Sequence, residues 1–493
     1  MNYMRSNIIF YFLGLVLLSS LSGCQDFLKE SSQDEIIPST VSDLRSVMYK
    51  EAYPYQFSSD NYVPLLTDEM TCNGLNYSSY ATVLQNGTPV FTFNPEMFDG
   101  TEAFPANENS WKKYYEKIKG CNVVIDQLAN VSGSEKDKNA LLGQSLCLRG
   151  YYYMKLVLLY GQAYTGTGVD PEVSLGVPLI LSMNVTDQFP SRNTLKEVYG
   201  QIEKDLTKGA TLLEENYVSE TAFRIGHVTA NALLTRFYLY KGDYEKLVQY
   251  ANKAITDGPA LTNISLGGVN FCIYDPSLST EVLWVYGSVV SRNSLYFSTS
   301  YSAATGAIPF TVSNSLIEMY DSANDLRYSS YFYYETMKST GVRYAVRGNK
   351  VGQNVSGFGE RGVRIGEVYI NRAEAAARLF KEKGNVADRT QALSDLNTLR
   401  RNRYKTGTYT NVNISDPDEL ITFCLAERQR ELCLEEGLRW YDIKRLGLSV
   451  SHTYINPEGA SSSHLLEAGS KLYALPIPYD AIGRNYKLVQ NPR

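Results

Sequence analysis

The chain has 493 residues and a formal net charge of −5 at pH 7. This acidic balance argues against nucleic acid as a partner, because nucleic-acid-binding proteins present a basic face. The hydrophobic fraction of 44% and the charged fraction of 20% are ordinary for a globular protein. The length exceeds the size at which a single core stops growing, so we expect more than one core or a layered superhelix.

The first segment has the residue order of a secretion signal. An apolar run from Ile8 to Leu18 follows the positive Arg5 and precedes small residues, and it is too short for a comfortable membrane span. The Leu-Ser-Gly-Cys sequence ending at Cys24 resembles a bacterial lipobox, whose cysteine is lipidated and becomes the first residue of the mature chain. We expect residues 1–23 to be a lipoprotein signal peptide and Cys24 to be the lipid anchor. An ordinary cleaved signal beside a chance cysteine is the alternative.

The body of the chain is predicted to consist of paired helices. Between Asn231 and Pro259, two helical stretches flank a Lys-Gly-Asp break that suits a tight turn. The positions that match a tetratricopeptide repeat are Leu234, Tyr238, Gly242, Tyr244, Ala254 and Pro259. Similar helical stretches are predicted at 110–161, 194–215, 367–403 and 415–447. One repeat cannot bury its hydrophobic face alone, so the predicted fold is mainly α, a tetratricopeptide-like superhelix of helical pairs.

Two long stretches lack a helical pattern. Residues 54–108 are rich in Asn, Gly, Ser, Thr, Pro and aromatic residues, and residues 259–362 mix short strand-like runs with Gly and Ser. Loops of this length are usually either functional or disordered, and their aromatic content argues against disorder. We therefore expect ordered inserts that lie on the helical scaffold.

The sequence contains no complete catalytic or metal-binding motif. Besides Cys24 there are six cysteines and no CxxC pair: Cys72, Cys121, Cys147, Cys272, Cys424 and Cys433. We interpret these cysteines as small buried hydrophobes, and we expect no metal site and no cofactor. The stretch GFGERG at Gly357–Gly362 has dinucleotide-binding spacing, but the βαβ unit that such a site needs is missing around it.

The segment Glu427–Gly447 is dense in acids and bases, which raises the question of acid–base catalysis. Charged residues spaced three or four apart are Glu427 and Arg430, Glu435 and Arg439, and Arg439 and Asp442. This spacing suits ion pairs on the surface of a helix, and we favour that structural interpretation over a catalytic one.

Several segments, in a fixed order, resemble one protein family. They are CQDFLKE after the lipobox, LCLRGYYYMKLVLLYG, RIGHVTANALLTRFYLYKGDYEKLVQYANKAI, EVYINRAEAAARL, LNTLRRNR, ERQRELCLEEGLRWYDIKRLG and LYALPIPYDAIGRNYKLVQNP. From Cys24 to Arg493 the chain resembles the SusD/RagB family of outer-membrane lipoproteins from Bacteroidetes. The resemblance implies an N-terminal helical region, residues 24–258, with the loop insert 54–108. It also implies a C-terminal region, residues 259–493, that is loop-rich over 259–362 and then helical.

The resemblance further implies a function without catalysis. Members of the family sit on the cell surface, cap a SusC-like TonB-dependent transporter, and pass captured oligosaccharides, or in some branches peptides, to its pore. We therefore expect a lipid-anchored protein of the outer membrane that faces the cell exterior, with a glycan ligand and such a transporter as partners. Capture of peptides or other nutrients, a protein-interaction scaffold and a glycan-degrading enzyme are the alternatives.

The family's glycan site varies between members, so the candidate residues come from this chain's own loops. A sugar ring presents apolar C–H faces and hydroxyl groups, which flat aromatic rings and Asn, Asp or Arg side chains can bind. Two stretches supply both kinds of group: Asn73, Asn76, Tyr77 and Tyr80, and Arg292, Asn293, Tyr296 and Tyr301. With 39 tyrosines and 3 tryptophans in the chain, a tyrosine-lined site is expected. The alternative is that these aromatic residues pack the loops onto the scaffold.

Overall fold

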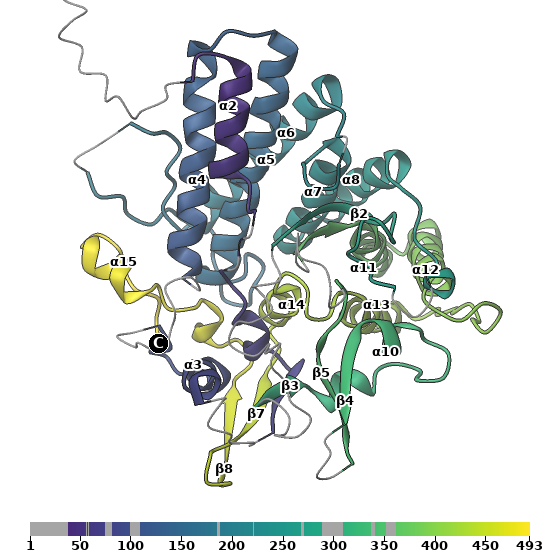
Figure 1. Ribbon diagram of the computed structural model, residues 1–493. Coiled ribbons are helices and arrows are strands. Elements are labelled where there is room, and N and C mark those ends of the chain that lie inside the picture. The colour runs from purple at the N-terminus through teal and green to yellow at the C-terminus, as the bar shows by residue number, and fades with distance from the viewer. Residues whose placement is uncertain are drawn as a thin grey trace, which may run out of the picture. The chain divides into compact units, whose positions relative to one another are not determined.

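The computed structural model describes most of the chain beyond residue 37 (Figure 1). The described residues are 38–55, 57, 59–73, 81–98, 109–184, 188–219, 221–267, 271–287, 309–336, 341–351 and 361–493. Residues from Thr40 to Arg493 form one compact unit. The predicted signal peptide and Cys24 lie outside the described residues, and the predicted division at residue 258 stays a prediction.

Helices pack on one another in chain order through most of the unit (Figure 1). The main helices are α2 (Val41–Val47), α4 (Ser110–Gln127), α5 (Glu135–Tyr160), α6 (Leu195–Asn216), α7 (His227–Lys241), α8 (Tyr244–Asp257), α11 (Ile365–Lys383), α12 (Val386–Arg401), α13 (Pro417–Leu432) and α14 (Leu438–Leu446). The turn between α7 and α8 is made by Gly242 in the left-handed region, at φ 80°, as the repeat pattern requires. The prediction of a mainly α fold is confirmed.

Strands occur in two-stranded antiparallel pairs in the described part of the chain. They are β1 (Met70–Cys72) with β3 (Phe310–Val312), β2 (Val282–Tyr286) with β6 (Arg361–Arg364), β4 (Phe332–Thr336) with β5 (Arg343–Gly348), and β7 (Val450–Ile455) with β8 (Ser461–Leu466). Shorter elements are the π-helix η2 (Met48–Ala52), the 3-10 helices η3 (Val63–Leu66), η6 (Leu128–Asn130), η7 (Ile264–Leu266) and η9 (Lys471–Tyr473), and the helices α9 (Asn314–Ile317), α10 (Arg327–Ser330) and α15 (Tyr479–Arg484).

One helix forms where the sequence suggested an irregular insert. The helix α3 (Ala81–Phe91) contains Gly87 and Pro89, both poor residues for a helix interior. Tertiary packing overrides this propensity, because a Cβ atom at Gly87 would lie only 2.6 Å from the ring of Phe310 on β3. Gly87 is therefore what lets α3 lie close against the β1–β3 pair.

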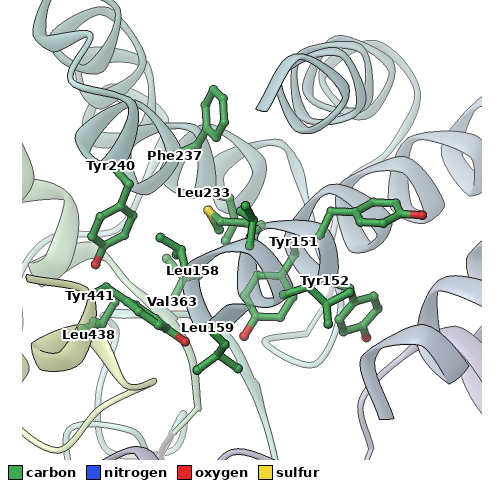
Figure 2. Packing of buried hydrophobic residues seen from close by; sticks show 14 of the residues in the cluster. Tyr151, Tyr152, Leu158, Leu159, Leu233, Phe237, Tyr240, Val363, Leu438 and Tyr441 are labelled. Carbon is green, nitrogen blue, oxygen red and sulfur yellow. The ribbon is translucent and has the colours of Figure 1, made fainter. Parts of the chain in front are cut away.

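The helix α5 is the centre of the core and is buried from Gly143 to Tyr160. Small residues let α6 approach it closely: a Cβ at Gly143 would lie 2.9 Å from Leu213, and one at Gly150 would lie 3.0 Å from Leu206. Figure 2 shows aromatic and aliphatic side chains of α5, α7 and α14 gathered in this core. Burial of such side chains supplies the main stabilisation of the helical stack.

The C-terminal end of α5 is closed by donors from distant parts of the chain. The last carbonyls of a helix have no partner within the helix itself. The donors here are Lys444 Nζ to Leu158 and to Gly161 (2.8 Å), Arg192 Nη2 to Tyr160 (3.2 Å), Asn491 Nδ2 to Tyr160 (2.8 Å), and the Leu475 amide to Leu159 (2.9 Å). Residues 475–491 are thereby fastened to the central helix of the N-terminal half.

A network of buried ions joins α13 to the segments around it. The Glu431 carboxylate lies 2.9 Å from Arg364, 2.9 Å from Arg403 and 3.1 Å from Arg327, with all four side chains 0% exposed. Burial alone would raise the pKa of Glu431, but these guanidinium groups hold it well below the ordinary value. Glu431 is therefore ionised in the folded protein, and it shares the compensation of these three arginines with other buried carboxylates.

The prediction that Glu427–Gly447 forms one helix with surface ion pairs is wrong. The helix breaks at residues 433–437, where Leu434, Glu436 and Gly437 all have positive φ angles. The break turns Glu435 inward to Arg364 (2.7 Å) and Lys350. It also turns Glu436 inward, to Lys155 (3.2 Å) and the Tyr151 hydroxyl (2.6 Å) of α5.

The three ion pairs predicted in this segment have different outcomes. The Glu427–Arg430 pair exists at 2.8 Å, but Glu427 is fully buried. Arg439 binds Asp68 (2.6 Å) instead of Glu435. Asp442 binds Arg428 and Arg445, at 2.7 and 2.8 Å. These carboxylates bind partners in the interior of the protein. Helical spacing alone could not predict those partners.

The six cysteines are buried, as predicted, and the three tryptophans are buried too. All six cysteines beyond Cys24 are buried and unbridged. Trp111 and Trp440 lie in the core on α4 and α14, and Trp284 is buried on β2. None of the helices that the structure describes is both long and apolar enough to cross a membrane.

The ion network predicts a specific loss of stability. Replacing the Glu431 carboxylate by an amide (Glu431→Gln) leaves three buried arginines under-compensated, so we expect the free energy of unfolding to fall by about 3–5 kcal/mol. Urea unfolding followed by circular dichroism measures this change. The control is Glu245→Gln, which removes an exposed pair with Lys383 and should leave the unfolding midpoint nearly unchanged. Equal midpoints for the two variants would contradict the role given to Glu431.

Candidate functional site

Most of the predicted glycan-binding residues lie outside the described residues. These are Asn76, Tyr77, Tyr80, Arg292, Asn293, Tyr296 and Tyr301. The exception is Asn73, whose backbone amide donates to the Pro309 carbonyl at 2.8 Å and whose side-chain amide donates to Thr311 Oγ1 at 2.9 Å. In this structure Asn73 therefore joins two backbone segments.

The β1–β3 pair brings together the points at which the two predicted binding stretches leave the scaffold. In its antiparallel register Cys72, the last residue of β1, lies opposite Phe310, the first residue of β3. Segment 74–80 follows β1 directly and segment 288–308 precedes β3, so both are attached at the same end of this pair. A shared site for the two stretches needs this proximity, and the identity of its residues stays a prediction.

The other end of segment 288–308 is attached beside a tyrosine. Gly287 follows β2 and forms an isolated parallel bridge with Tyr55. The amide of Val285, on the same strand, donates to the Ala222 carbonyl at 2.8 Å. The segments around Tyr55 and Ala222 are therefore held next to each other at the end of β2.

A cleft of about 810 Å³ opens at this place. Its walls come from α2 and η2, the first half of α5, the end of α6 and residues 217–224, and Figure 1 shows α2, α5 and α6 as neighbours. The aromatic residues that line it are Tyr49, Tyr55, Tyr217 and Phe223; polar residues are Arg45, Asp137, Gln144, Asn216, Thr221 and Arg224. Volume and composition both fall in the range of small-molecule sites.

Two aromatic rings of the cleft are open to solvent. Tyr55 is 67% exposed and Phe223 is 39% exposed. Aromatic rings with this exposure, on the wall of a concave site, present an apolar surface to a ligand. Singly exposed aromatic residues need no explanation on a protein surface, but two on the wall of one cleft indicate a binding surface.

The floor of the cleft is fixed by Tyr53. Its hydroxyl donates to Gln144 Oε1 at 2.6 Å and accepts the Ile225 amide at 3.0 Å, and burial raises its pKa well above the ordinary value. The ring of Tyr49 meets it edge-on, with centroids 5.8 Å apart and planes at 74°. On the cleft wall, the ring of Tyr49 therefore packs against a tyrosine whose hydroxyl group is held by two hydrogen bonds.

This cleft was hard to predict from the sequence because its residues come from several separated segments. Tyr49 and Tyr55 lie near the start of the chain, while Phe223 and Arg224 lie between two predicted helices. One feature of the sequence could have indicated the cleft: an aromatic residue next to an arginine, Phe223-Arg224, in the segment between two predicted helices. Aromatic and arginine side chains are the types most enriched in binding surfaces.

A second cleft, of about 800 Å³, lies at the C-terminal end of α5 and is less suited to a ligand. Its buried cations, Arg192 and Lys444, already donate to the backbone carbonyls that close α5. Burial lowers the pKa of Lys444 to about 7. These side chains have a structural use that accounts for their position.

The carboxylates in the described interior are mostly held as ions. Burial alone would raise the pKa values of Asp60, Glu374 and Glu427, but neighbouring cations lower each of them to about 2. Glu69 is different: burial, with the nearby Asp68 charge, raises its pKa to about 8. Its Oε2 accepts the Leu434 amide at 2.8 Å, and its Oε1 has no hydrogen-bond partner.

Comparison with known proteins shows similarity along nearly the whole chain. Residues 26–239 match a SusD-like family model described as starch-binding and associating with the outer membrane, and residues 284–493 match the SusD family model. SusD-like protein P2 of Formosa agariphila is 23% identical, over 97% of this chain and 98% of that protein.

Solved structures show the same fold. A SusD superfamily protein from Bacteroides vulgatus superposes with a TM-score of 0.70 at 20% identity, over 92% of this chain and 99% of the other. A SusD-like carbohydrate binding protein from the same species gives a TM-score of 0.67 at 20% identity, over 91% of this chain and 97% of the other.

The environment of Glu69 predicts a pH-dependent stability. Its pKa is about 8 in the folded protein and near 4.5 when unfolded, so between these values the folded state binds more protons than the unfolded state. This group therefore makes stability fall as pH rises from about 4.5 to about 8, by up to about 1.4 kcal/mol per pH unit. Glu69→Gln, which cannot ionise, should flatten that decline in urea unfolding between pH 5 and pH 8. Parallel curves for the native protein and the variant would refute the assignment.

Proposed function

This chain belongs to the SusD/RagB family, and on that premise we propose that it is a non-catalytic lipoprotein of the outer membrane that binds oligosaccharide or polysaccharide. We further propose that it passes this ligand to a SusC-like TonB-dependent transporter. The observation that carries the binding proposal is the cleft of about 810 Å³ with the exposed rings of Tyr55 and Phe223.

The cleft has the groups that a sugar needs. The rings of Tyr55 and Phe223 offer flat apolar faces for the C–H face of a pyranose, and Asn216 and Thr221 offer amide and hydroxyl groups on the same walls. Binding by stacking and hydrogen bonds requires no bond to form or break. Segment 288–308, which carries the predicted residues Arg292, Asn293, Tyr296 and Tyr301, follows Gly287, and Gly287 forms a bridge with Tyr55.

Removing the exposed rings should weaken glycan binding. We expect Tyr55→Ala and Phe223→Ala each to lower the affinity for a bound glycan by about threefold to tenfold, since an aromatic contact contributes about 0.5–1.5 kcal/mol. Affinity electrophoresis of lipid-free residues 25–493 in gels that contain candidate polysaccharides measures the change. Tyr479→Ala removes a ring of similar exposure, 63%, on α15 and is the matched control.

Two results would count against the binding proposal as it stands. Unchanged retardation in the double variant of Tyr55 and Phe223 would place the glycan elsewhere. The variants Tyr77→Ala and Tyr296→Ala then show whether the loop stretches hold it instead. Release of reducing ends during incubation with the retained glycan would show that the protein is an enzyme.

The anchor proposal concerns Cys24. Cys24→Ser removes the thiol that would carry the lipid, so we expect the variant to leave the membrane fraction and to lose incorporation of labelled fatty acid. Membrane association that survives in Cys24→Ser would show that another feature holds the protein there.

The proposed partner is tested separately. The wild-type protein, solubilised with detergent from a Bacteroidetes host, should co-purify with a TonB-dependent transporter.

A further inference from the structure

We infer that the cleft selects glycans that carry an anionic substituent, a carboxylate or a sulfate, and that Arg224 is the residue that binds it. This inference rests on the proposed function, because it assigns a ligand class to the same cleft. It is carried by an arginine that is held in place by aromatic rings and has no acidic partner among the residues that the structure describes.

Arg224 is not neutralised by any acid in the part of the chain that the structure describes. Its Nη1 donates to the carbonyl of the adjacent Phe223 at 2.9 Å. The acid on the cleft wall, Asp137, lies 3.3 Å from Arg45 and is paired with it. Nearby Glu135, outside the cleft lining, is paired with Lys138 at 3.7 Å. The positive charge of Arg224 is therefore free to meet a ligand.

Two rings fix the position of this guanidinium group. Its central carbon lies 3.8 Å from the ring centroid of Tyr49 and 4.8 Å from that of Tyr53. Contact with an aromatic face engages the flat side of a guanidinium and leaves N–H groups along its edge for an anion. Since Tyr53 is itself held by Gln144 and the Ile225 amide, the arginine is arranged before binding and loses little side-chain entropy.

The charge of the cleft differs in sign from that of the protein. Arg45 and Arg224 are its cations and Asp137 is its one anion, so the wall carries one excess positive charge. The whole chain has a net charge of −5.

The adjoining rings identify the anion as part of a sugar. Tyr55 and Phe223 are exposed on the same walls and offer stacking surfaces for a pyranose, which a free inorganic anion could not use. Carboxylate and sulfate both accept paired hydrogen bonds from the edge of a guanidinium. Uronic-acid residues and sulfated sugars therefore present the same chemistry to Arg224.

Matched pairs of oligosaccharides test the inference. Isothermal titration of lipid-free residues 25–493 would compare oligogalacturonate with its methyl ester, and a sulfated galactan oligomer with its desulfated form. We expect the anionic member of at least one pair to bind about tenfold more tightly, as a charge-assisted hydrogen bond allows. That preference should weaken as NaCl is raised. The pair that shows it identifies carboxylate or sulfate.

Variants at position 224 separate charge from fold. Arg224→Gln should lower the affinity for the anionic member about tenfold and leave the neutral member unchanged, while Arg224→Lys should retain part of the preference. Arg401→Gln, at an exposed arginine of α12 outside the cleft, is the control. Thermal unfolding of each variant confirms that it is folded.

The outcomes distinguish this inference from the proposed function. Equal binding of the charged and neutral members, or an undiminished preference in folded Arg224→Gln, overturns the inference and leaves glycan binding intact. Failure of every oligosaccharide to bind the native protein overturns both. Loss of binding to neutral and anionic members alike in Arg224→Gln assigns Arg224 to the general structure of the cleft and also refutes the inference.

Discussion

The rest of the structure depends on the inward turn of three glutamates, Glu431, Glu435 and Glu436. A carboxylate buried without a partner costs several kcal/mol, so each of these must be met by cations and N–H groups from other segments. Glu431 gathers arginines from the C-terminal half, whereas Glu436 reaches α5, where Tyr151 and Lys155 bind it. Glu436 also accepts the Gly362 amide at 2.7 Å. These contacts therefore hold together, in one arrangement, two halves of the chain that are far apart in sequence.

That arrangement determines where the irregular segments leave the scaffold. Gly362 lies opposite Val285 where β6 pairs with β2, and β2 is followed by Gly287 beside Tyr55. Glu69, which precedes β1, is bound by the Leu434 amide of the same turn that carries Glu435 and Glu436. The position of the cleft and the attachment points of the loops are thus consequences of the ion network as well as of the helical stack.

The sequence predicted the helices well where one local pattern decided the outcome. The turn at Gly242 follows from the need for a left-handed residue between α7 and α8. The break at residues 433–437 was missed because the charged pattern across it continues at helical spacing. The residues whose ion pairs stabilise the break, such as Lys155 and Lys350, lie far away in the chain. The helix α3 was missed because Gly87 and Pro89 disfavour a helix, and only the contact with Phe310 reverses that preference. The cleft was missed for the same reason, since Tyr55 and Phe223 meet only in the folded chain.

The closure of α5 by residues 475–491 has a consequence for biogenesis. A chain synthesised from its N-terminus onward contains α5 long before Leu475 and Asn491 are added. Until then the carbonyls at the end of that helix must be hydrated, and its apolar face is incompletely covered. Completion of the native state therefore waits for the C-terminal segment, and in the interval the exposed apolar surface makes the nascent polypeptide prone to aggregation.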